Sequence, residues 1–284
     1  MERTRVCIVG FGRLGRACAA ALRECPELEL AGVVRRPGSP QVLPGHLAQA
    51  RIAAHVRDLE GIDVVLLCVP ASQSEAGARE LIQQRFALVE CAQVEPEQRD
   101  AYYDALADFA LRHHARAMLG AGWDPGAFTL MRAAFEMLIP RGQTQFTRRP
   151  GASMHHTAAA EGVEGVRDAL AVEYPGPDGR LQRYVYVELE DGARPQRVSA
   201  AIAADPAFAG EATQVFVVDG IAALEEEAHG ILLERRGTAP GGAHQTMLLE
   251  GRGDPVALAA RAMVDAGRRL PSLKVGGHRY FLGL

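Results

Sequence analysis

The sequence predicts an α/β protein that combines a doubly wound parallel sheet with a second, α+β domain built on a mostly antiparallel sheet. Up to about residue 120, short apolar runs alternate with helical segments, which is typical of a parallel sheet. Afterwards, strand-like runs separated by turn residues dominate. With 284 residues and 48% hydrophobic content, the chain can bury two cores. We expect a first domain over residues 1–121, onto which residues 255–284 pack back, and a second domain over residues 122–254.

The chain begins with a dinucleotide-binding signature. The apolar run over residues 6–9 is typical of a buried parallel strand, and three glycines in G-x-G-x-x-G spacing separate it from an Ala- and Leu-rich helix. The first glycine permits a tight turn, the second lets backbone approach a pyrophosphate at the helix N-terminus, and the third lets helix pack on strand. The pattern predicts a Rossmann-type site whose loop residues are Gly10, Gly12, Arg13, Leu14 and Gly15.

A second strand over residues 28–34 indicates which dinucleotide binds. A site for NAD usually carries Asp or Glu at the end of this strand, where it binds the ribose 2′-hydroxyl. Here the strand ends in Arg35 and Arg36, and arginine at this place accommodates a 2′-phosphate. Two solvated arginines are the alternative, and NADP is the cofactor we predict.

The remaining apolar runs complete the two sheets. Residues 62–70 predict a strand whose end at Cys68, Val69 and Pro70 opens onto the cofactor, because ligands bind at the carboxyl ends of such strands. The other elements expected in the first domain are helices at 72–84 and 96–114 and strands at 86–90 and 115–120. The second domain should contain helices at 129–139 and 197–203, a hairpin turn at 176–179, and strands at 169–174, 183–189, 213–218, 230–235 and 246–250, before a final helix at 255–270.

Composition and charge argue against several classes of protein. The net charge is −4 and no basic stripe with interleaved aromatics is present, which argues against a nucleic-acid partner. No apolar run is long enough to span a membrane and no signal-peptide pattern precedes the first strand, so we expect a cytoplasmic protein. The five cysteines show no C-x-x-C pairing, which favours reduced thiols and no metal site.

Motifs spread over most of the chain resemble the meso-diaminopimelate dehydrogenase family, and its shorter, thermophilic branch in particular. Their order and spacing make the match specific up to about residue 270. In chain order they are Val33-Val-Arg-Arg36, Gly122-Trp-Asp-Pro-Gly126, Ser153-Met-His-His156, Gly165-Val-Arg-Asp-Ala169, Tyr186-Val-Glu-Leu-Glu190, and His229-Gly230 followed by Glu234-Arg235. The resemblance implies an NADP-dependent homodimer that oxidatively deaminates the D-configured centre of meso-diaminopimelate, with a second domain for substrate binding and dimerisation.

The resemblance also implies catalytic residues. Deamination needs a carboxylate or water near the reacting nitrogen, because the ammonium must lose a proton before hydride leaves. Asp124 matches the family aspartate that holds this amino group, with a turn-stabilising Asp as the alternative. Glu90 matches the first of two further family acids, and Trp123 would wall the pocket unless it is simply a core residue.

The far end of the substrate is assigned in the same way. Arg183 matches the arginine that grips the distal carboxylate, although on sequence alone it could equally be a solvated arginine. His229 matches a histidine near that end, and a lone histidine is otherwise usually structural. Met154 and the backbone around His155 match residues that line the pocket.

Several pocket positions depart from the family pattern. Glu90-Cys-Ala-Gln93 stands in place of Asp-Ser-Tyr/Phe-Asp, so the second acid becomes a neutral amide. Glu173 replaces a threonine, where it would either repel a distal carboxylate or pair with Arg183 and cancel its charge. Gln245 replaces an asparagine that binds substrate, and His155 replaces a glycine. These departures suggest altered substrate use.

We therefore expect an NADP-dependent amino-acid dehydrogenase acting on meso-diaminopimelate or a related D-amino or diamino acid. Two alternatives remain open. One is an NADP-dependent reductase of another carbonyl or imine substrate. The other is a non-catalytic NADPH-binding sensor, which the loss of the second acid at Gln93 keeps possible.

Overall fold

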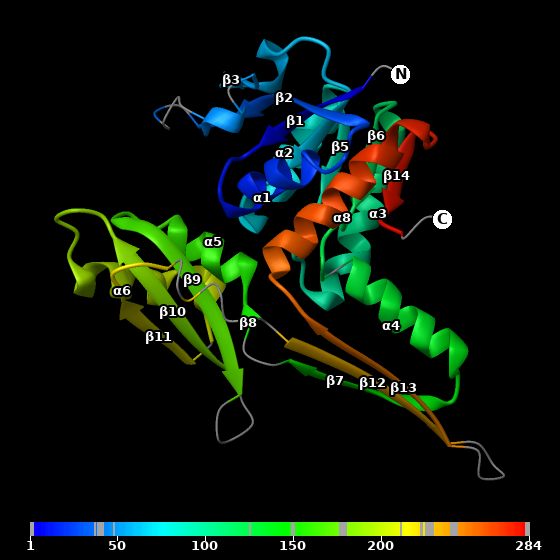
Figure 1. The fold of residues 1–284 in the computed structure, drawn as a ribbon, viewed down its shortest axis with the longest axis vertical. Helices are drawn as coiled ribbons and strands as arrows, with labels where there is room; N and C mark the ends of the chain where they lie inside the picture. Colours follow the sequence, from blue (N-terminus) through cyan, green and yellow to red (C-terminus); the bar gives the residue numbers. More distant parts are fainter. Residues whose placement is uncertain are drawn as a thin grey trace. The chain divides into compact units, whose positions relative to one another are not determined.

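The computed structural model divides into two compact units (Figure 1), one comprising Met1–Met131 with Val256–Leu284 and the other Arg132–Pro255. It describes residues 3–281 except 37, 39–42, 48, 125, 149–150, 176–180, 211, 222–223, 225–229 and 239–243. The expected division placed residues 122–131 in the second domain, whereas they group with the first unit here.

The first unit contains a parallel sheet of seven strands in the order β14-β6-β5-β4-β1-β2-β3. These strands are β1 (Thr4–Val9), β2 (Leu28–Val34), β3 (Arg51–Ala53), β4 (Val64–Leu67), β5 (Ala87–Glu90), β6 (Arg116–Leu119) and β14 (Gly276–Arg279). The chain runs outward from β1 through β2 and β3, then returns to β4 on the other side of β1. In doubly wound sheets, ligands bind at the carboxyl ends of the strands where the order reverses, which here are β1 and β4. The predicted doubly wound fold is confirmed.

Helices cover both faces of this sheet (Figure 1), and alternate strand residues select the face. Helices α1 (Arg13–Leu22) and α8 (Pro255–Arg269) share a core with Val6 and Ile8 of β1. Helices α2 (Ala71–Gln83) and α3 (Pro96–Arg112) share the other core with Cys7 of the same strand. The central strand β4 (Val-Val-Leu-Leu) is apolar throughout because both of its faces are buried.

The edge strands β3 and β14 were missed in the sequence. β14 reads Gly-Gly-His-Arg and has no apolar pattern. A Cβ on Gly277 would lie 2.4 Å from the Cα of Ala107 in α3, so glycine is needed where strand and helix approach closely. Arg279 then donates to both Asp100 and Asp104 of that helix. This strand therefore forms because of its tertiary contacts and not because of a local preference of its residues.

The second unit contains two sheets. One has the order β11-β10-β9-β8 and the other β13-β12-β7, with every described pairing antiparallel except that of β10 with β11. Their strands are β7 (Gly142–Arg148), β8 (Gly151–Ala152), β9 (Val166–Pro175), β10 (Leu181–Leu189), β11 (Ala212–Val217), β12 (Gly230–Thr238) and β13 (His244–Arg252). The predicted mostly antiparallel sheet is confirmed, and the expected hairpin turn at 176–179 lies outside the described residues.

Within the described residues, helices α4, α5 and α6 accompany these sheets. Helix α4 (Ala127–Leu138) runs across the boundary between the units in sequence. Helices α5 (Met154–Glu161) and α6 (Pro195–Ala204) contribute Ala160, Val198 and Ile202 to a core formed with β9 and β10. Helix α5 was not predicted, because eight residues are too few to show a clear apolar period.

Candidate active site

The glycine loop has the geometry that dinucleotide binding requires. Gly10 has φ of +90°, and a Cβ there would lie 2.3 Å from the carbonyl oxygen of Cys68. A Cβ on Gly15 would lie 2.1 Å from the carbonyl oxygen of Gly10, so helix α1 sits directly against the loop. Gly12, by contrast, is exposed and has no neighbouring atom within 4 Å of a Cβ position. An open backbone before a helix N-terminus without a side-chain cap fits a pyrophosphate.

The loop lies beside the end of β2. The backbone N–H of Gly10 donates to the carbonyl of Val34, and the guanidinium of Arg35 stands over the ring of Phe11, 5.6 Å from its centroid. Arg36, the next residue, is exposed. Positive charge therefore borders the glycine loop at the strand end that contacts the ribose in dinucleotide folds. Sequence reasoning missed Phe11, although an aromatic between the first two glycines was a visible signal.

The other expected cofactor residues lie at the same edge of the sheet. Cys68 follows β4, is buried, and donates its backbone N–H to the carbonyl of Val9 over 2.7 Å. Val69 is half-buried, and Pro70 precedes the first turn of α2. Arg13 and Leu14 are half-buried in the first turn of α1. All of these residues follow the carboxyl ends of β1 and β4.

Glu90 ends β5 and is completely buried. Its Oε1 accepts a hydrogen bond from the backbone N–H of Gly120 and its Oε2 one from Ala92, both over 2.7 Å, while the hydroxyl of Tyr102 donates to Oε2 over 3.2 Å. Tyr102 also shares a hydrogen bond with the buried Ser74. Burial raises the pKa of Glu90 to about 7, and the three donors oppose that rise. Tyr102 and Ser74 were not predicted, since helical position alone does not indicate them.

The turn after β6 carries Trp123 and Asp124, both with half-buried side chains. Gln93 donates its amide to the backbone oxygen of Asp124 over 3.4 Å. Trp123 packs against Phe128 of α4, with ring centroids 5.8 Å apart. A Cβ on Gly126 would lie 2.1 Å from the Gly122 carbonyl, so glycine closes the turn. Because β6 is parallel to β1, this turn and the glycine loop emerge at the same edge of the sheet.

In the second unit, the structure brings Glu173 and Arg183 together. They are directly opposite across the β9–β10 ladder, and the guanidinium donates to the carboxylate over 2.9 Å. Arg183 is 3% exposed, so it is not a solvated arginine. Gln245 lies on β13 with an exposed side chain, opposite Gly237 of β12.

Three expected pocket residues are only partly described or not described. Met154 and His155 form the first turn of α5, and their side chains lie outside the described residues, as does the whole of His229. In that part of the chain, Ser153 before the helix makes a 2.7 Å hydrogen bond with the ring nitrogen Nδ1 of His156. The assignments of Met154, His155 and His229 stay predictions.

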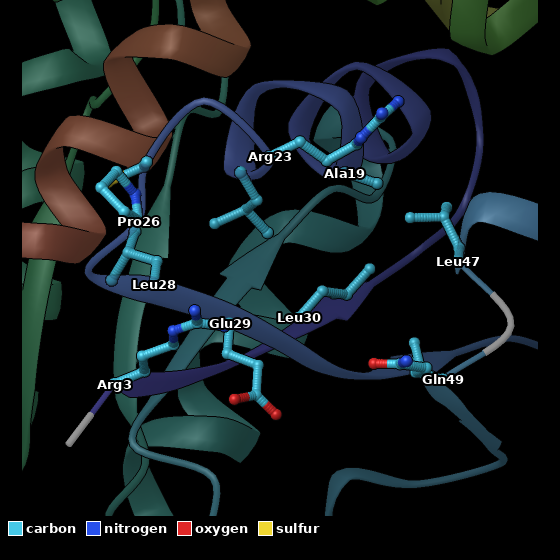
Figure 2. A pocket seen from close by; sticks show the side chains of 12 residues that line it. Arg3, Ala19, Arg23, Pro26, Leu28, Glu29, Leu30, Leu47 and Gln49 are labelled. Carbon is cyan, nitrogen blue, oxygen red and sulfur yellow. The ribbon is translucent and has the colours of Figure 1, made fainter.

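A pocket of about 330 Å³ lies elsewhere, between the second half of α1 and the start of β2 (Figure 2). The side chains that line it include Leu28, Leu30, Arg3, Arg23 and Glu29. It contains none of the predicted site residues. Within the described part of the chain, no group of His, Cys, Asp or Glu side chains could hold a metal ion, and no helix is long and apolar enough to cross a membrane.

Known proteins with similar sequences are named as meso-diaminopimelate D-dehydrogenases. No protein-family profile matches the chain. A meso-diaminopimelate D-dehydrogenase of Bacteroides fragilis is 34% identical over 268 residues, covering 94% of this chain and 89% of that protein. One from Ureibacillus thermosphaericus is 29% identical over 228 residues, covering 73% of this chain and 69% of that protein.

Solved structures agree in fold. The DAP dehydrogenase of C. glutamicum in complex with DAP matches with a TM-score of 0.75 at 21% identity, covering 98% of this chain and 93% of that one. An engineered D-amino acid dehydrogenase bound to NADP+ matches with a TM-score of 0.78 at 20% identity and the same coverage. Together with the identity to the Bacteroides protein over nearly the whole length, these similarities show that the chain belongs to the meso-diaminopimelate dehydrogenase family, a family of amino-acid dehydrogenases.

Proposed function

We propose that the protein is an NADP-dependent dehydrogenase that oxidatively deaminates meso-diaminopimelate or a related D-amino or diamino acid, and catalyses the reverse reductive amination. The observation that carries the proposal is the Trp123–Asp124 turn, which emerges at the same edge of the sheet as the glycine loop. A carboxylate at this edge would be available to a substrate amine beside the nicotinamide. The names of the relatives support the same reaction.

Asp124 is the residue that we assign to the reacting amino group. An ionised carboxylate accepts hydrogen bonds from an ammonium, orients it, and takes up a proton directly or through water. The amide of Gln93 holds the Asp124 backbone, so the carboxylate starts from a fixed position. The bound nicotinamide supplies the hydride chemistry. Trp123, packed on Phe128, would exclude water from one side.

The choice of NADP rests on Arg35 and Arg36. No acidic side chain follows β2, and Arg35 stands over Phe11 of the glycine loop. A guanidinium at this point can bind the 2′-phosphate through charge-assisted hydrogen bonds, which are stronger than a hydrogen bond to the neutral 2′-hydroxyl of NAD.

The proposed assembly is a cytoplasmic homodimer, formed through the second unit. The exposed side chains there include Met137 and Leu138 at the end of α4 and Leu248 on β13, with exposures of 73%, 58% and 59%. Met137 and Leu138 are neighbours in the chain, and exposed apolar side chains that gather in a patch are typical of surfaces that bury them against a partner. Light scattering on the wild type and on Met137→Glu with Leu138→Glu should show a dimer and a monomer respectively, and a monomeric wild type would contradict the assembly.

The decisive experiment follows NADP reduction spectrophotometrically at alkaline pH, with meso-diaminopimelate and a panel of D-amino and diamino acids. We expect turnover of at least one of them by the wild type. Asp124→Asn should then abolish turnover and leave the Kd for NADPH unchanged, whereas the matched change at the exposed Asp108, Asp108→Asn, should alter neither. NADPH binding without turnover of any substrate would contradict the proposal and favour the sensor. Retained activity in Asp124→Asn would remove Asp124 from the reaction.

A further inference from the structure

We propose that Glu90 is a positioning residue, whose buried carboxylate fixes the turn that carries Asp124, and that it does not itself contact substrate. The inference rests on the proposed function, because it concerns the same site. It also replaces the role in proton transfer that the sequence suggested for Glu90. Three observations carry it: the burial of the side chain, the donors that occupy its oxygens, and the elements that those donors belong to.

The carboxylate has no surface from which to reach a substrate. Glu90 is 0% exposed, and each of its oxygens accepts a 2.7 Å hydrogen bond from a backbone N–H, one from Ala92 and one from Gly120. A proton acceptor in catalysis must lie within hydrogen-bond reach of the proton that it removes. The side chain points instead into the protein, where it accepts from donors that would otherwise be buried without partners.

The two backbone donors belong to different strands. Ala92 follows β5, and Gly120 follows β6 and begins the turn to Asp124. The backbone of Glu90 adds a third connection, because its carbonyl accepts from the N–H of Ala121 over 2.8 Å. One residue therefore joins the ends of two neighbouring strands through both its side chain and its main chain.

The length of the side chain matters for this role. Aspartate is shorter by one methylene, about 1.5 Å, so it cannot keep both backbone contacts at 2.7 Å while β5 and β6 stay in place. The family pattern that this chain resembles has Asp at this position. Glutamate is long enough to accept from both backbone donors here, and its carboxylate is completely buried.

Neighbouring helices hold the carboxylate in turn. Tyr102 of α3 donates to it, and Ser74 of α2 shares a hydrogen bond with Tyr102. Burial and the charge of Glu90 raise the pKa of Tyr102, so its hydroxyl stays protonated and remains a donor. Gly120 has φ of +69°, and a Cβ there would lie 2.4 Å from the hydroxyl of Tyr103. The start of the turn is therefore held by the contacts with Glu90 and by the close approach of Tyr103, and Gln93 contacts its other end at Asp124.

The test compares Glu90→Gln with Arg116→Gln. Glutamine offers a single acceptor oxygen, so one of the two backbone donors loses its partner. Arg116 lies at the opposite end of β6, where it donates to the Leu273 carbonyl over 2.7 Å, and its loss should destabilise the same strand without moving the turn. Tyr102→Phe keeps both backbone contacts and should have a smaller effect than Glu90→Gln.

For Glu90→Gln we expect kcat to fall about tenfold to a hundredfold, the scale of a catalytic group misplaced by about 1 Å. The Kd for NADPH should stay unchanged, and amide hydrogen exchange should accelerate at Gly120 or Ala92. For Arg116→Gln we expect a lower melting temperature with unchanged kcat. Glu90→Asp, which keeps the charge and one contact, should restore part of the activity.

Two results would overturn the proposal. Equal losses of kcat in Glu90→Gln and Arg116→Gln would reduce Glu90 to general stability. A complete loss of turnover in Glu90→Gln with unchanged exchange at Gly120 and Ala92 would make Glu90 a catalytic residue. If the wild type turns over no amino acid, the proposed function fails, and hydrogen exchange still decides whether Glu90 holds the turn.

Discussion

Arg183 donates to Glu173 over 2.9 Å across the β9–β10 ladder, with side-chain exposures of only 4% and 13%. An ion pair withdrawn from water in this way is strongly coupled, because removing either partner leaves a desolvated charge. Of the two outcomes that the sequence allowed for Glu173, the structure shows the one in which it pairs with Arg183. The positive charge of Arg183, which the family resemblance assigns to a distal carboxylate of the substrate, is therefore already compensated by Glu173.

Glu173→Gln should change substrate preference. The variant keeps a hydrogen-bond acceptor for Arg183 but removes the opposing charge, so a substrate with a distal carboxylate should gain about tenfold or more in kcat/KM over one without it. The measurement is the ratio of kcat/KM for meso-diaminopimelate to that for D-lysine. Glu188→Gln on β10, the strand that carries Arg183, breaks the more exposed ion pair with Arg167; it is the control and should leave the ratio unchanged. An unaltered ratio in Glu173→Gln would separate this ion pair from substrate recognition.

Replacement of the two arginines after β2 should weaken NADPH binding selectively. Arg35→Met keeps apolar contact with Phe11 while it removes the charge. We expect the Kd for NADPH to rise about tenfold to a hundredfold in Arg35→Met or Arg36→Ala, with little change for NADH. Fluorescence titration with both nucleotides measures this, with the exposed Arg23→Ala as control. Equal weakening of both nucleotides would mean that neither arginine binds the 2′-phosphate.

Two glycines of the loop should respond differently to alanine. Gly12→Ala introduces a Cβ with no atom within 4 Å, so the melting temperature should hardly change while NADPH affinity falls. Gly15→Ala places a Cβ 2.1 Å from the Gly10 carbonyl and should lower the free energy of unfolding by about 1–3 kcal/mol. Thermal unfolding and nucleotide titration on both variants separate the two effects. A destabilised Gly12→Ala that binds NADPH normally would reverse the assignment.

Glu90 should make stability depend on pH. Burial raises its pKa from 4.5 to about 7, so the folded protein retains this proton at a pH where the unfolded chain loses it. The contribution is fully present below pH 4.5 and is lost as pH rises toward 7, a difference on the order of 3 kcal/mol. Denaturant unfolding of the wild type and Glu90→Gln across this range should show their stability difference falling toward pH 7 and then levelling. A difference that is independent of pH would show that Glu90 titrates normally.

The sequence predicted features that depend on consecutive residues. The glycine loop, Arg35 and Asp124 each belong to a short pattern that follows a strand, and the parallel order of strands places such patterns at one edge. The buried strands of the first unit were found for the same reason, since both faces require apolar side chains.

Features that depend on distant residues were not predictable. The hydrogen bond from Gly120 to Glu90 joins residues 30 positions apart, and nothing local indicates that the carboxylate turns inward. β14 forms a strand because it pairs with β6 and packs closely against α3. β7, with the sequence Gly-Gln-Thr-Gln-Phe-Thr-Arg, is polar and becomes a strand by pairing with β12.

Because β14 is the last strand in the chain, the parallel sheet of the first unit can be completed only at the end of synthesis. The ribosome delivers β1 to β6 first, then the continuous stretch Arg132–Pro255, and only afterwards the segment that pairs along β6. Until then the nascent sheet of the first unit has an unprotected edge, which is prone to pair with other chains. The second unit can meanwhile form from residues that have all left the ribosome. The first unit is formed by two separate segments of the chain, because Arg132–Pro255 is inserted between them. We therefore expect it to complete its fold last, although its synthesis begins first.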